Sequence, residues 1–145
     1  MNRLDDFPDV NVWVALSSVE HAGHAAAKRY FEDEHWDRLA FGWGSAMGLL
    51  RVTSRHHTFG GVPLSPRDAW ANLEAWLEHP DVVLLHEPVG LRRHLANWAE
   101  HGVATSRNWS DLYLAAFAMG HNLRLVTFDQ AFQQLPSLRV LTLHA

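Results

Sequence analysis

The chain has 145 residues, of which 48% are hydrophobic and 19% charged, and these proportions predict one globular domain over residues 1–145. It contains no cysteine, which excludes a disulfide framework, thiolate zinc sites and a cysteine nucleophile. The formal net charge of −4 gives no overall sign of nucleic-acid binding, although a basic patch can be local. Because no secretory leader and no apolar run of about 18 residues is present, we expect a cytoplasmic protein without membrane contact.

Segments with strand and helix periods alternate along the chain. The clearest helix start is Ser65, followed by Pro66 at the first helical position and by Asp68 three residues after the serine. Residues 55–62 are expected to form a loop. The expected strands are 7–9, 39–41, 82–85, 123–127 and 140–143, and the expected helices are 11–17, 21–36, 45–53, 65–79, 88–101, 108–120 and 130–135. This alternation predicts an α/β fold, a three-layer α/β/α sandwich with a mainly parallel central sheet.

Three aspartates lie in apolar surroundings, at positions 9, 111 and 129. Burying an ionised carboxylate is costly unless a cation or several donors lie beside it, and no lysine or arginine is close to Asp9 in the sequence. Asp9 and Asp129 each lie where an apolar strand gives way to a helix, which places both at the carboxyl edge of a parallel sheet, where ligands bind in such folds. We therefore predict that the three aspartates meet at one site.

Helix capping is the alternative interpretation of these carboxylates. Asp129 precedes a short helix and is a preferred N-cap residue. Asp111 lies in a first helical turn, where an acid offsets the helix dipole, and Asn108 three residues earlier resembles a capping box. Against this, Leu114 and the alanines beyond it indicate that the helix face of Asp111 points inward, and Asp9, placed in a strand, is expected to cap nothing. Capping thus explains one or two of the three aspartates.

Oxygen ligands alone select hard cations, so the predicted ion is Mg²⁺, with Mn²⁺ as the other possibility. Asn11 and Thr127 lie two residues from Asp9 and Asp129. Their side chains either orient ligands and waters at the metal or have ordinary turn and strand roles.

The order of these motifs resembles the PIN domain family, and more narrowly the VapC toxins of bacterial toxin–antitoxin pairs. The resemblance covers nearly the whole chain. It is carried by Asp9-Val10-Asn11-Val12, His21-x-x-His24-x-x-Ala27, Gly48-Leu49-Leu50-Arg51, Asp111-x-x-Leu114-Ala115-Ala116-x-Ala118 and Leu125-Val126-Thr127-Phe128-Asp129.

The resemblance implies a magnesium-dependent endoribonuclease that acts on transfer or ribosomal RNA. It also implies a homodimer and a VapB-type antitoxin that inserts into the active-site groove. By position, Asp9, Asp111 and Asp129 match the family's metal-binding catalytic acids. Most PIN nucleases carry a further acid where this chain has Gly48. That departure motivates the alternative, a catalytically weakened PIN-like domain that acts as an RNA- or protein-binding module.

Contacts to RNA are predicted on arginine and tryptophan side chains, since cations bind phosphates and indole rings stack on bases. The alternative interpretation of each arginine is an ordinary solvated surface residue. Trp70 and Trp76, on a patterned helix, are instead expected in the core, and His21 and His24 are expected to be structural. The candidate RNA-binding residues are Arg51, Arg55, Arg107 and Trp109. A phosphotransfer enzyme or receiver domain is disfavoured, because Asn11 stands where the former needs an acid and the single lysine, Lys28, is in an early helix.

Overall fold

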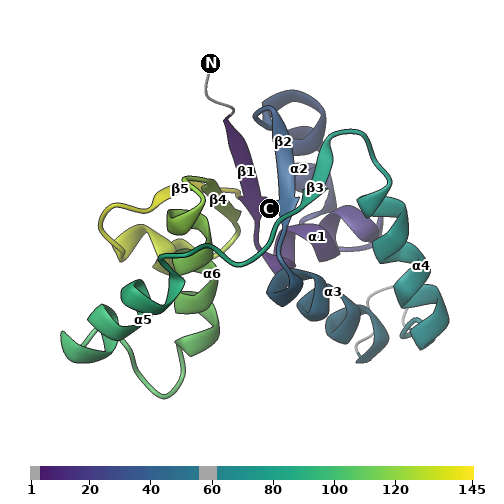
Figure 1. Ribbon diagram of the computed structural model, residues 1–145. Coiled ribbons are helices and arrows are strands. Elements are labelled where there is room, and N and C mark those ends of the chain that lie inside the picture. Colours follow the sequence, from purple (N-terminus) through teal and green to yellow (C-terminus); the bar gives the residue numbers. More distant parts are fainter. Residues whose placement is uncertain (1–3, 56–61) are drawn as a thin grey trace.

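The computed structural model describes residues 4–55 and 62–145. Within these residues five strands form one sheet of order β3-β2-β1-β4-β5, and every neighbouring pair is parallel (Figure 1). The strands are β1 (Asp5–Pro8), β2 (Arg38–Phe41), β3 (Val82–Leu84), β4 (Arg124–Thr127) and β5 (Arg139–Thr142). The predicted parallel sheet is therefore confirmed, and all five expected strands are present within a few residues of their predicted bounds.

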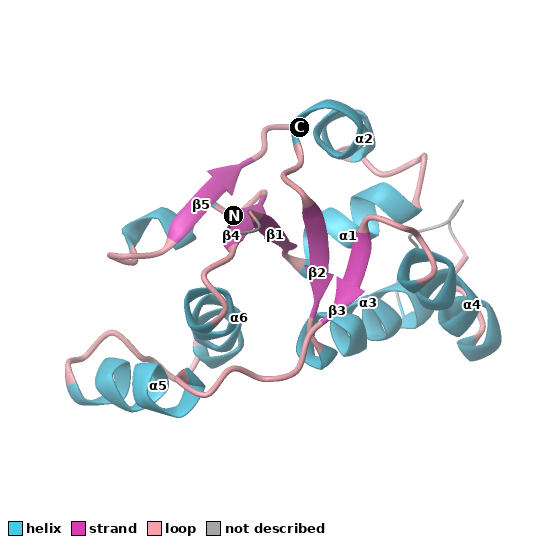
Figure 2. Cartoon of the chain, turned by 45° about the horizontal axis from the view of Figure 1, so that its top comes forward, coloured by secondary structure: helices cyan, strands magenta, loops and turns pink. Residues whose placement is uncertain are grey.

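Helices cover both faces of the sheet, which confirms the three-layer sandwich (Figure 2). One layer packs against Val126 of the sheet and the other against Phe7 and Leu125. The first layer contains α1 (Val10–Ser17), α2 (His24–Arg29), the π-helical turn η1 (Tyr30–Glu34), α3 (Trp43–Arg55) and α4 (Pro66–Leu77); the second contains α5 (Leu91–Glu100), α6 (Trp109–Gly120) and the 3₁₀ helix η2 (Gln130–Gln134).

Aromatic pairs fix the two cores on either side of the sheet. The Trp13 ring of α1 stacks on Phe41 of β2 with centroids 3.9 Å apart, and the Phe7 ring of β1 stacks on Phe117 of α6 at 4.7 Å. Trp76 packs beside Trp13 at 5.4 Å, as expected for a core residue. The expectation for Trp70 is wrong, because its side chain on the outer face of α4 is 45% exposed.

Several helix bounds differ from those predicted. The helix start at Ser65 is confirmed, since its Oγ accepts a hydrogen bond from the Asp68 amide at 3.1 Å, but α4 ends at Leu77 rather than at residue 79. The helix expected over 21–36 is divided into α2 and the wider π-helical turn η1. Most of the loop expected at 55–62 lies outside the described residues.

Pro8 ends the central strand β1, where the ladder permits a residue without an N–H. The Asp9 amide donates to the Val126 carbonyl of β4 at 2.8 Å, so the preceding Pro8 nitrogen faces β2. Pairing between β1 and β2 extends only from Asp5 to Asp6 on the β1 side, so no donor is needed at Pro8.

Across the described residues, every helix falls short of the length and apolarity that a membrane span requires.

Candidate active site

The two central strands, β1 and β4, bring Asp9 and Asp129 to the same edge. Thr127, the last residue of β4, is fully buried and connects them. Its hydroxyl donates to Asp9 Oδ2 at 2.8 Å, and the oxygen of this Thr127 hydroxyl also accepts from the Asp129 amide at 3.0 Å. Thr127 therefore orients the Asp9 carboxylate and fixes the backbone at Asp129.

Asp9 is buried, with 8% of its surface exposed, and it caps the helix that begins at the next residue. Its Oδ1 accepts from the Val10 amide at 2.7 Å. The expectation that Asp9 caps nothing is therefore wrong, because β1 gives way to α1 without an intervening loop. Capping leaves both oxygens with lone pairs to spare, since a carboxylate accepts about four hydrogen bonds or metal contacts.

Asp129 is exposed and caps η2, where its Oδ1 accepts from the Ala131 amide at 2.9 Å. Its predicted capping role is thus confirmed. Asn11, in the first turn of α1, accepts a long hydrogen bond from the Phe128 amide at 3.4 Å. This contact joins α1 to the segment between β4 and η2, so Asn11 helps to position Asp129 through the backbone.

Asp111 lies in the first turn of α6, at the rim of the site. Its side chain is exposed rather than turned inward, although Leu112 and Leu114 beside it are buried. The expected capping box with Asn108 is absent from the described structure. Asn108 instead holds the loop before α6, accepting from the Thr105 amide at 2.8 Å and donating to the Val103 carbonyl at 3.0 Å.

The three carboxylates act on one another electrostatically. Burial raises the pKa of Asp9, the hydrogen bonds from Thr127 and Val10 oppose that shift, and the charges of Asp111 and Asp129 add to it. Partial desolvation of the Asp111 carboxyl at the rim, together with the charge of Asp129, likewise raises the pKa of Asp111. Among the described residues no lysine, arginine or histidine forms an ion pair with any of the three. The edge therefore concentrates negative charge that a bound cation would offset.

The donor chemistry of this edge fits a hard divalent cation, because carboxylate, hydroxyl and amide oxygens are the ligands that magnesium and manganese prefer. As the side chains lie, no three histidine or acidic residues within the described chain are close enough to form a ready-made metal site. The three aspartates thus lie at the same edge of the sheet and interact electrostatically, but they do not already form a closed coordination cage.

Gly48, at the position where the family pattern has an acid, lies where α3 passes closest to α1. A Cβ at Gly48 would meet Val10 Cγ2 at 2.5 Å, and a Cβ at Gly44, one turn earlier, would meet Tyr113 Cε2 of α6 at 2.3 Å. Both distances are far below ordinary van der Waals contact. The two glycines let α3 press against the helices that carry Asp9 and Asp111, and a longer side chain at Gly48 would displace Val10.

Two of the predicted RNA-binding residues line one groove beside this contact. Arg51 and Trp109 face a hollow of about 320 Å³ whose floor includes Val10 and Gly48. Trp109 is 47% exposed. Tyr113 also lines the groove and was not predicted; its hydroxyl donates to Glu87 Oε1 at 2.8 Å, and burial with this carboxylate raises the pKa of Tyr113 to about 12.

The remaining predicted residues lie farther from the groove. Arg55 ends α3 and Arg107 lies in the loop before α6, and both are exposed. His21 and His24 have the structural roles predicted for them. His21 Nδ1 accepts from the Gly23 amide at 2.9 Å, and His24 Nδ1 pairs with the Ala15 carbonyl of α1 at 2.8 Å.

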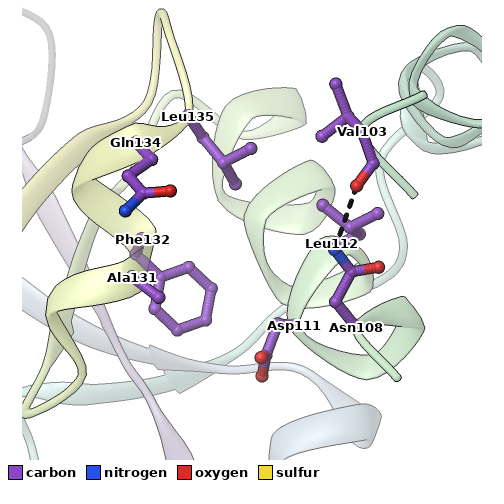
Figure 3. A pocket seen from close by; sticks show the side chains of 8 residues that line it. All are labelled: Val103, Asn108, Asp111, Leu112, Ala131, Phe132, Gln134 and Leu135. Carbon is purple, nitrogen blue, oxygen red and sulfur yellow. Dashed lines mark hydrogen bonds between the residues drawn. The ribbon is translucent and has the colours of Figure 1, made fainter. Parts of the chain in front are cut away.

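A second hollow lies on the other side of the first turn of α6 (Figure 3). Its volume is about 330 Å³, and it is enclosed by η2 on one side and by α6 with the preceding loop on the other. Asp111 lies at its edge, so the hollow opens beside the candidate site. No pattern in the sequence predicted it, because its walls come from two separate segments, residues 103–112 and 131–135.

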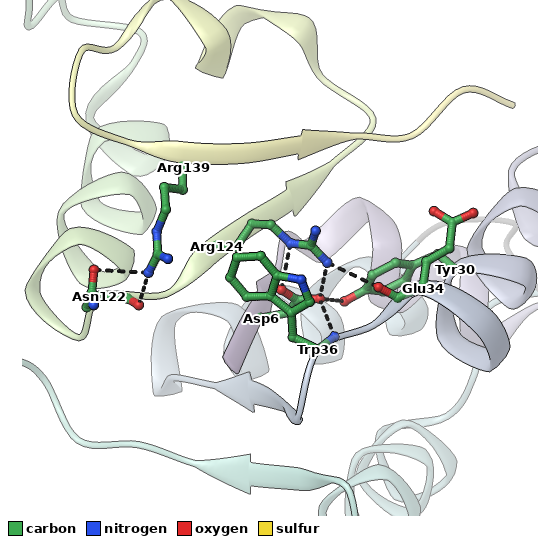
Figure 4. Close-up of polar contacts among 7 residues, drawn as sticks. All are labelled: Asp6, Tyr30, Glu34, Trp36, Asn122, Arg124 and Arg139. Atoms are coloured by element: carbon green, nitrogen blue, oxygen red, sulfur yellow. Dashed lines mark hydrogen bonds and ion pairs between the residues drawn. The ribbon is translucent and has the colours of Figure 1, made fainter. Parts of the chain in front are cut away.

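A different pair of aspartates lies at the amino end of β1. Asp6 is fully buried and accepts hydrogen bonds from Arg124 at 2.8 and 2.9 Å, from the Tyr30 hydroxyl at 2.6 Å and from the Trp36 amide at 3.2 Å (Figure 4). Burial and the neighbouring Asp6 charge raise the pKa of Tyr30. Asp5 is paired with Arg38 at 2.7 Å. Both carboxylates at this end of the strand have arginine partners.

Comparison with known proteins decides the family. The sequence model of the PIN domain family matches residues 7–138, which is most of the chain. The chain belongs to the PIN domain family. Ribonuclease VapC41 of Mycobacterium tuberculosis is 33% identical over 131 residues, covering 87% of this PIN domain chain and 90% of that protein. Ribonuclease VapC43 of the same species is 29% identical over 135 residues, covering 90% of each. The chain therefore falls among the VapC-type PIN domains.

Solved structures show the same fold at low sequence identity. VapBC-1 from nontypeable Haemophilus influenzae matches with a TM-score of 0.69 at 20% identity, over 96% of this chain and 98% of that one. Mycobacterium tuberculosis VapC20, described as a sarcin–ricin loop cleaving toxin, matches with a TM-score of 0.67 at 18% identity, over 88% and 92%. These likenesses support the PIN domain architecture.

Proposed function

We propose that this PIN domain protein is a metal-dependent endoribonuclease, the toxin of a VapBC-type toxin–antitoxin pair. The kinship with VapC ribonucleases supports the reaction class. The observation that carries the proposal is the Asp9 carboxylate, which is buried at the carboxyl edge of the sheet beside two further acids, held by neutral donors and paired with no basic side chain of the described structure. Such a carboxylate is suited to a cation supplied from solution.

The proposed ligands are Asp9, Asp111 and Asp129, with Mg²⁺ as the ion and Mn²⁺ as a substitute. Magnesium usually keeps several waters and takes only a few carboxylates, which suits acids that share an edge without forming a cage. When bound, the ion lowers the pKa of a water and steadies the charge on the phosphate being cut. Thr127 holds the Asp9 oxygens in place, and Asn11 holds the backbone before Asp129.

The RNA strand is proposed to enter along the groove of Arg51 and Trp109, where a guanidinium meets phosphate and an exposed indole offers a face for stacking. Arg55 and Arg107 would contact phosphates beyond the groove. Transfer or ribosomal RNA is the proposed substrate class, a VapB-type antitoxin the proposed partner, and a cytoplasmic homodimer the proposed state. Solved structures of the same fold include complexes that are named VapBC, and these complexes support the proposed antitoxin partner.

The direct test is cleavage of RNA by purified protein in Mg²⁺ or Mn²⁺, with chelator as the control. We expect cleavage that chelator abolishes and that Asp9→Asn lowers by about a hundredfold or more while the fold survives. The matched control is Asp33→Asn on the exposed surface of η1, which should keep the wild-type rate. Wild-type cleavage by Asp9→Asn, or no cleavage and no ion binding by the wild-type protein, would contradict the proposal.

Gly48 supports a second candidate, a PIN domain that binds RNA or a protein without cutting it. Close contact with Val10 leaves no room at Gly48 for the acid that the family pattern carries there. This candidate predicts that the protein binds RNA equally well with and without chelator and cleaves it in neither condition. Metal-dependent cleavage, abolished by Asp9→Asn, would exclude it.

A further inference from the structure

The hollow beside Asp111 has the size and the walls of a site for a small, largely apolar group (Figure 3). Its volume of about 330 Å³ is at the lower end of the range found for ligand pockets. The walls include Leu112 and Phe132, whose side chains are almost fully buried, together with Val103 and Leu135. Such walls favour a group that gains by leaving water.

The charge of the hollow argues against a phosphate as its occupant. Among the described residues that line it, none is basic and one, Asp111, is acidic. A phosphate would be repelled by that carboxylate and would find no cation to offset the repulsion. The Arg51 groove on the other side of the first turn of α6 has a basic side chain and no acidic one among its described lining residues. The two hollows therefore suit different parts of a nucleotide.

The polar groups of the hollow are arranged to contact a ligand edge. The Asn108 amide is already engaged with Thr105 and Val103, so it is rigid. The Gln134 amide lines the opposite wall and makes no hydrogen bond to other residues of the described chain. A glutamine amide both donates and accepts, which allows it to pair with the edge of a nucleobase.

We propose that this hollow receives one nucleobase of the RNA, that of the nucleotide next to the phosphate at the acidic edge. The inference rests on the proposed ribonuclease function and adds a base-specific subsite to it. Asp111 belongs both to the acidic edge and to the wall of the hollow, so a strand whose phosphate lies at the acids has an adjacent base within reach of Gln134. The backbone then continues past Trp109 and Arg51 on the other side of α6.

The test uses two variants that change the hollow and one that does not. Gln134→Leu removes the free amide at nearly constant size, and Ala131→Trp places a ring in the hollow; both positions are exposed, so folding should be unaffected. The matched control is Gln133→Leu, one residue earlier on η2. Gln133 donates to Thr142 of β5 at 2.7 Å and does not line the hollow.

The first measurement is cleavage of a short random-sequence RNA pool, read as base preference at each position around the cut. Wild-type protein and Gln133→Leu should share a preference at one flanking position, Gln134→Leu should reduce that preference at least tenfold, and Ala131→Trp should raise KM for every sequence. An unchanged preference in both hollow variants would overturn the inference while leaving the ribonuclease function intact.

The second measurement is binding of the same RNAs in chelator, which does not depend on cleavage. Replacing one nucleotide at a time by an abasic unit should weaken binding to the wild-type protein about tenfold at a single position, and the effect should vanish in Ala131→Trp. An equal loss in both proteins, or no sensitive position, would overturn the subsite. Base-dependent binding without cleavage in any metal would instead contradict the proposed enzyme and leave the subsite standing.

Discussion

The two ends of β1 carry aspartates in opposite situations. At the amino end Asp5 and Asp6 are each paired with an arginine. Asp6 also accepts from a tyrosine hydroxyl and a backbone amide (Figure 4). At the carboxyl end Asp9 accepts from one hydroxyl and one amide and faces two further carboxylates. All three acids are buried, and they lie within five residues of one another.

The amino end of β1 stabilises the fold, whereas the carboxyl end leaves a charge uncompensated. Breaking a buried ion pair is costly, so Arg124 and Asp6 tie β4 to β1 and close the amino end of the sheet. At Asp9 the protein supplies neutral donors only; burial raises the pKa of Asp9, and the neighbouring acids add to that shift. The first arrangement is structural, whereas the second suits a cation that arrives with the substrate or from solution.

The largest contrast should appear when the same substitution is made at both ends. Asp6→Asn should lower the free energy of unfolding by about 3 kcal/mol, because it leaves Arg124 largely buried without its charge partner. Asp9→Asn should change it by about 1 kcal/mol or less, since loss of one hydrogen bond is offset by removal of a desolvated charge. Urea unfolding measures both, and equal losses would show that the two ends are alike.

A smaller effect is expected where α3 approaches the acidic end. Gly48→Ala should cost about 1–2 kcal/mol despite the better helix propensity of alanine, because its Cβ would lie 2.5 Å from Val10 Cγ2. Adding Val10→Ala should recover most of the loss, a coupling that double-mutant unfolding measures. Gly90→Ala is the control, since its Cβ would have no neighbour closer than 3.7 Å. A neutral Gly48→Ala would show that the close contact is not what excludes an acid there.

The smallest effect is expected at Thr127, and it should depend on pH. The Thr127 hydroxyl lowers the pKa of Asp9, while burial raises it above the ordinary value in the folded protein. Ionising Asp9 therefore costs stability as the pH rises through its folded pKa, and the cost is absent below the ordinary pKa, where Asp9 is neutral in both states.

Removing the Thr127 hydroxyl increases the free-energy cost of ionising Asp9 in the folded protein. Thr127→Val should lose about 1 kcal/mol at neutral pH and less in acid, while Thr127→Ser keeps the hydroxyl and should keep the wild-type dependence of stability on pH. Unfolding measured between about pH 4 and pH 8 gives the comparison. A loss that is constant with pH would mean that the Thr127–Asp9 hydrogen bond does not act on the ionised carboxyl.

Much of the fold could be predicted from the sequence because its signals are local. Apolar strand runs, the Ser65 cap and the alternation with helices define the parallel sheet, and the place of Asp9 and Asp129 after strands sets their common edge. Asp9 was wrongly expected to cap nothing, because nothing in the sequence marks that α1 begins at the next residue.

Other features depend on contacts that no sequence spacing reveals. The partner of Asp6 lies 118 residues away, and Tyr113 of α6 donates to Glu87 in the segment between β3 and α5. The sequence placed Asp111 on an inward face, whereas the first turn of α6 begins at the surface and leaves it at the rim. The hollow lined by Gln134 is likewise formed only when η2 packs beside α6.

Calorimetric titration of Mg²⁺, repeated with Mn²⁺, shows whether the carboxyl end of β1 binds the ion when the wild-type protein is compared with Asp9→Asn and Asp5→Asn. We predict that the wild-type protein and Asp5→Asn bind the ion with the same Kd, and that Asp9→Asn binds at least about tenfold more weakly. Equal binding by Asp9→Asn, or no binding by the wild-type protein, would contradict the assignment of the carboxyl end of β1 as the metal site.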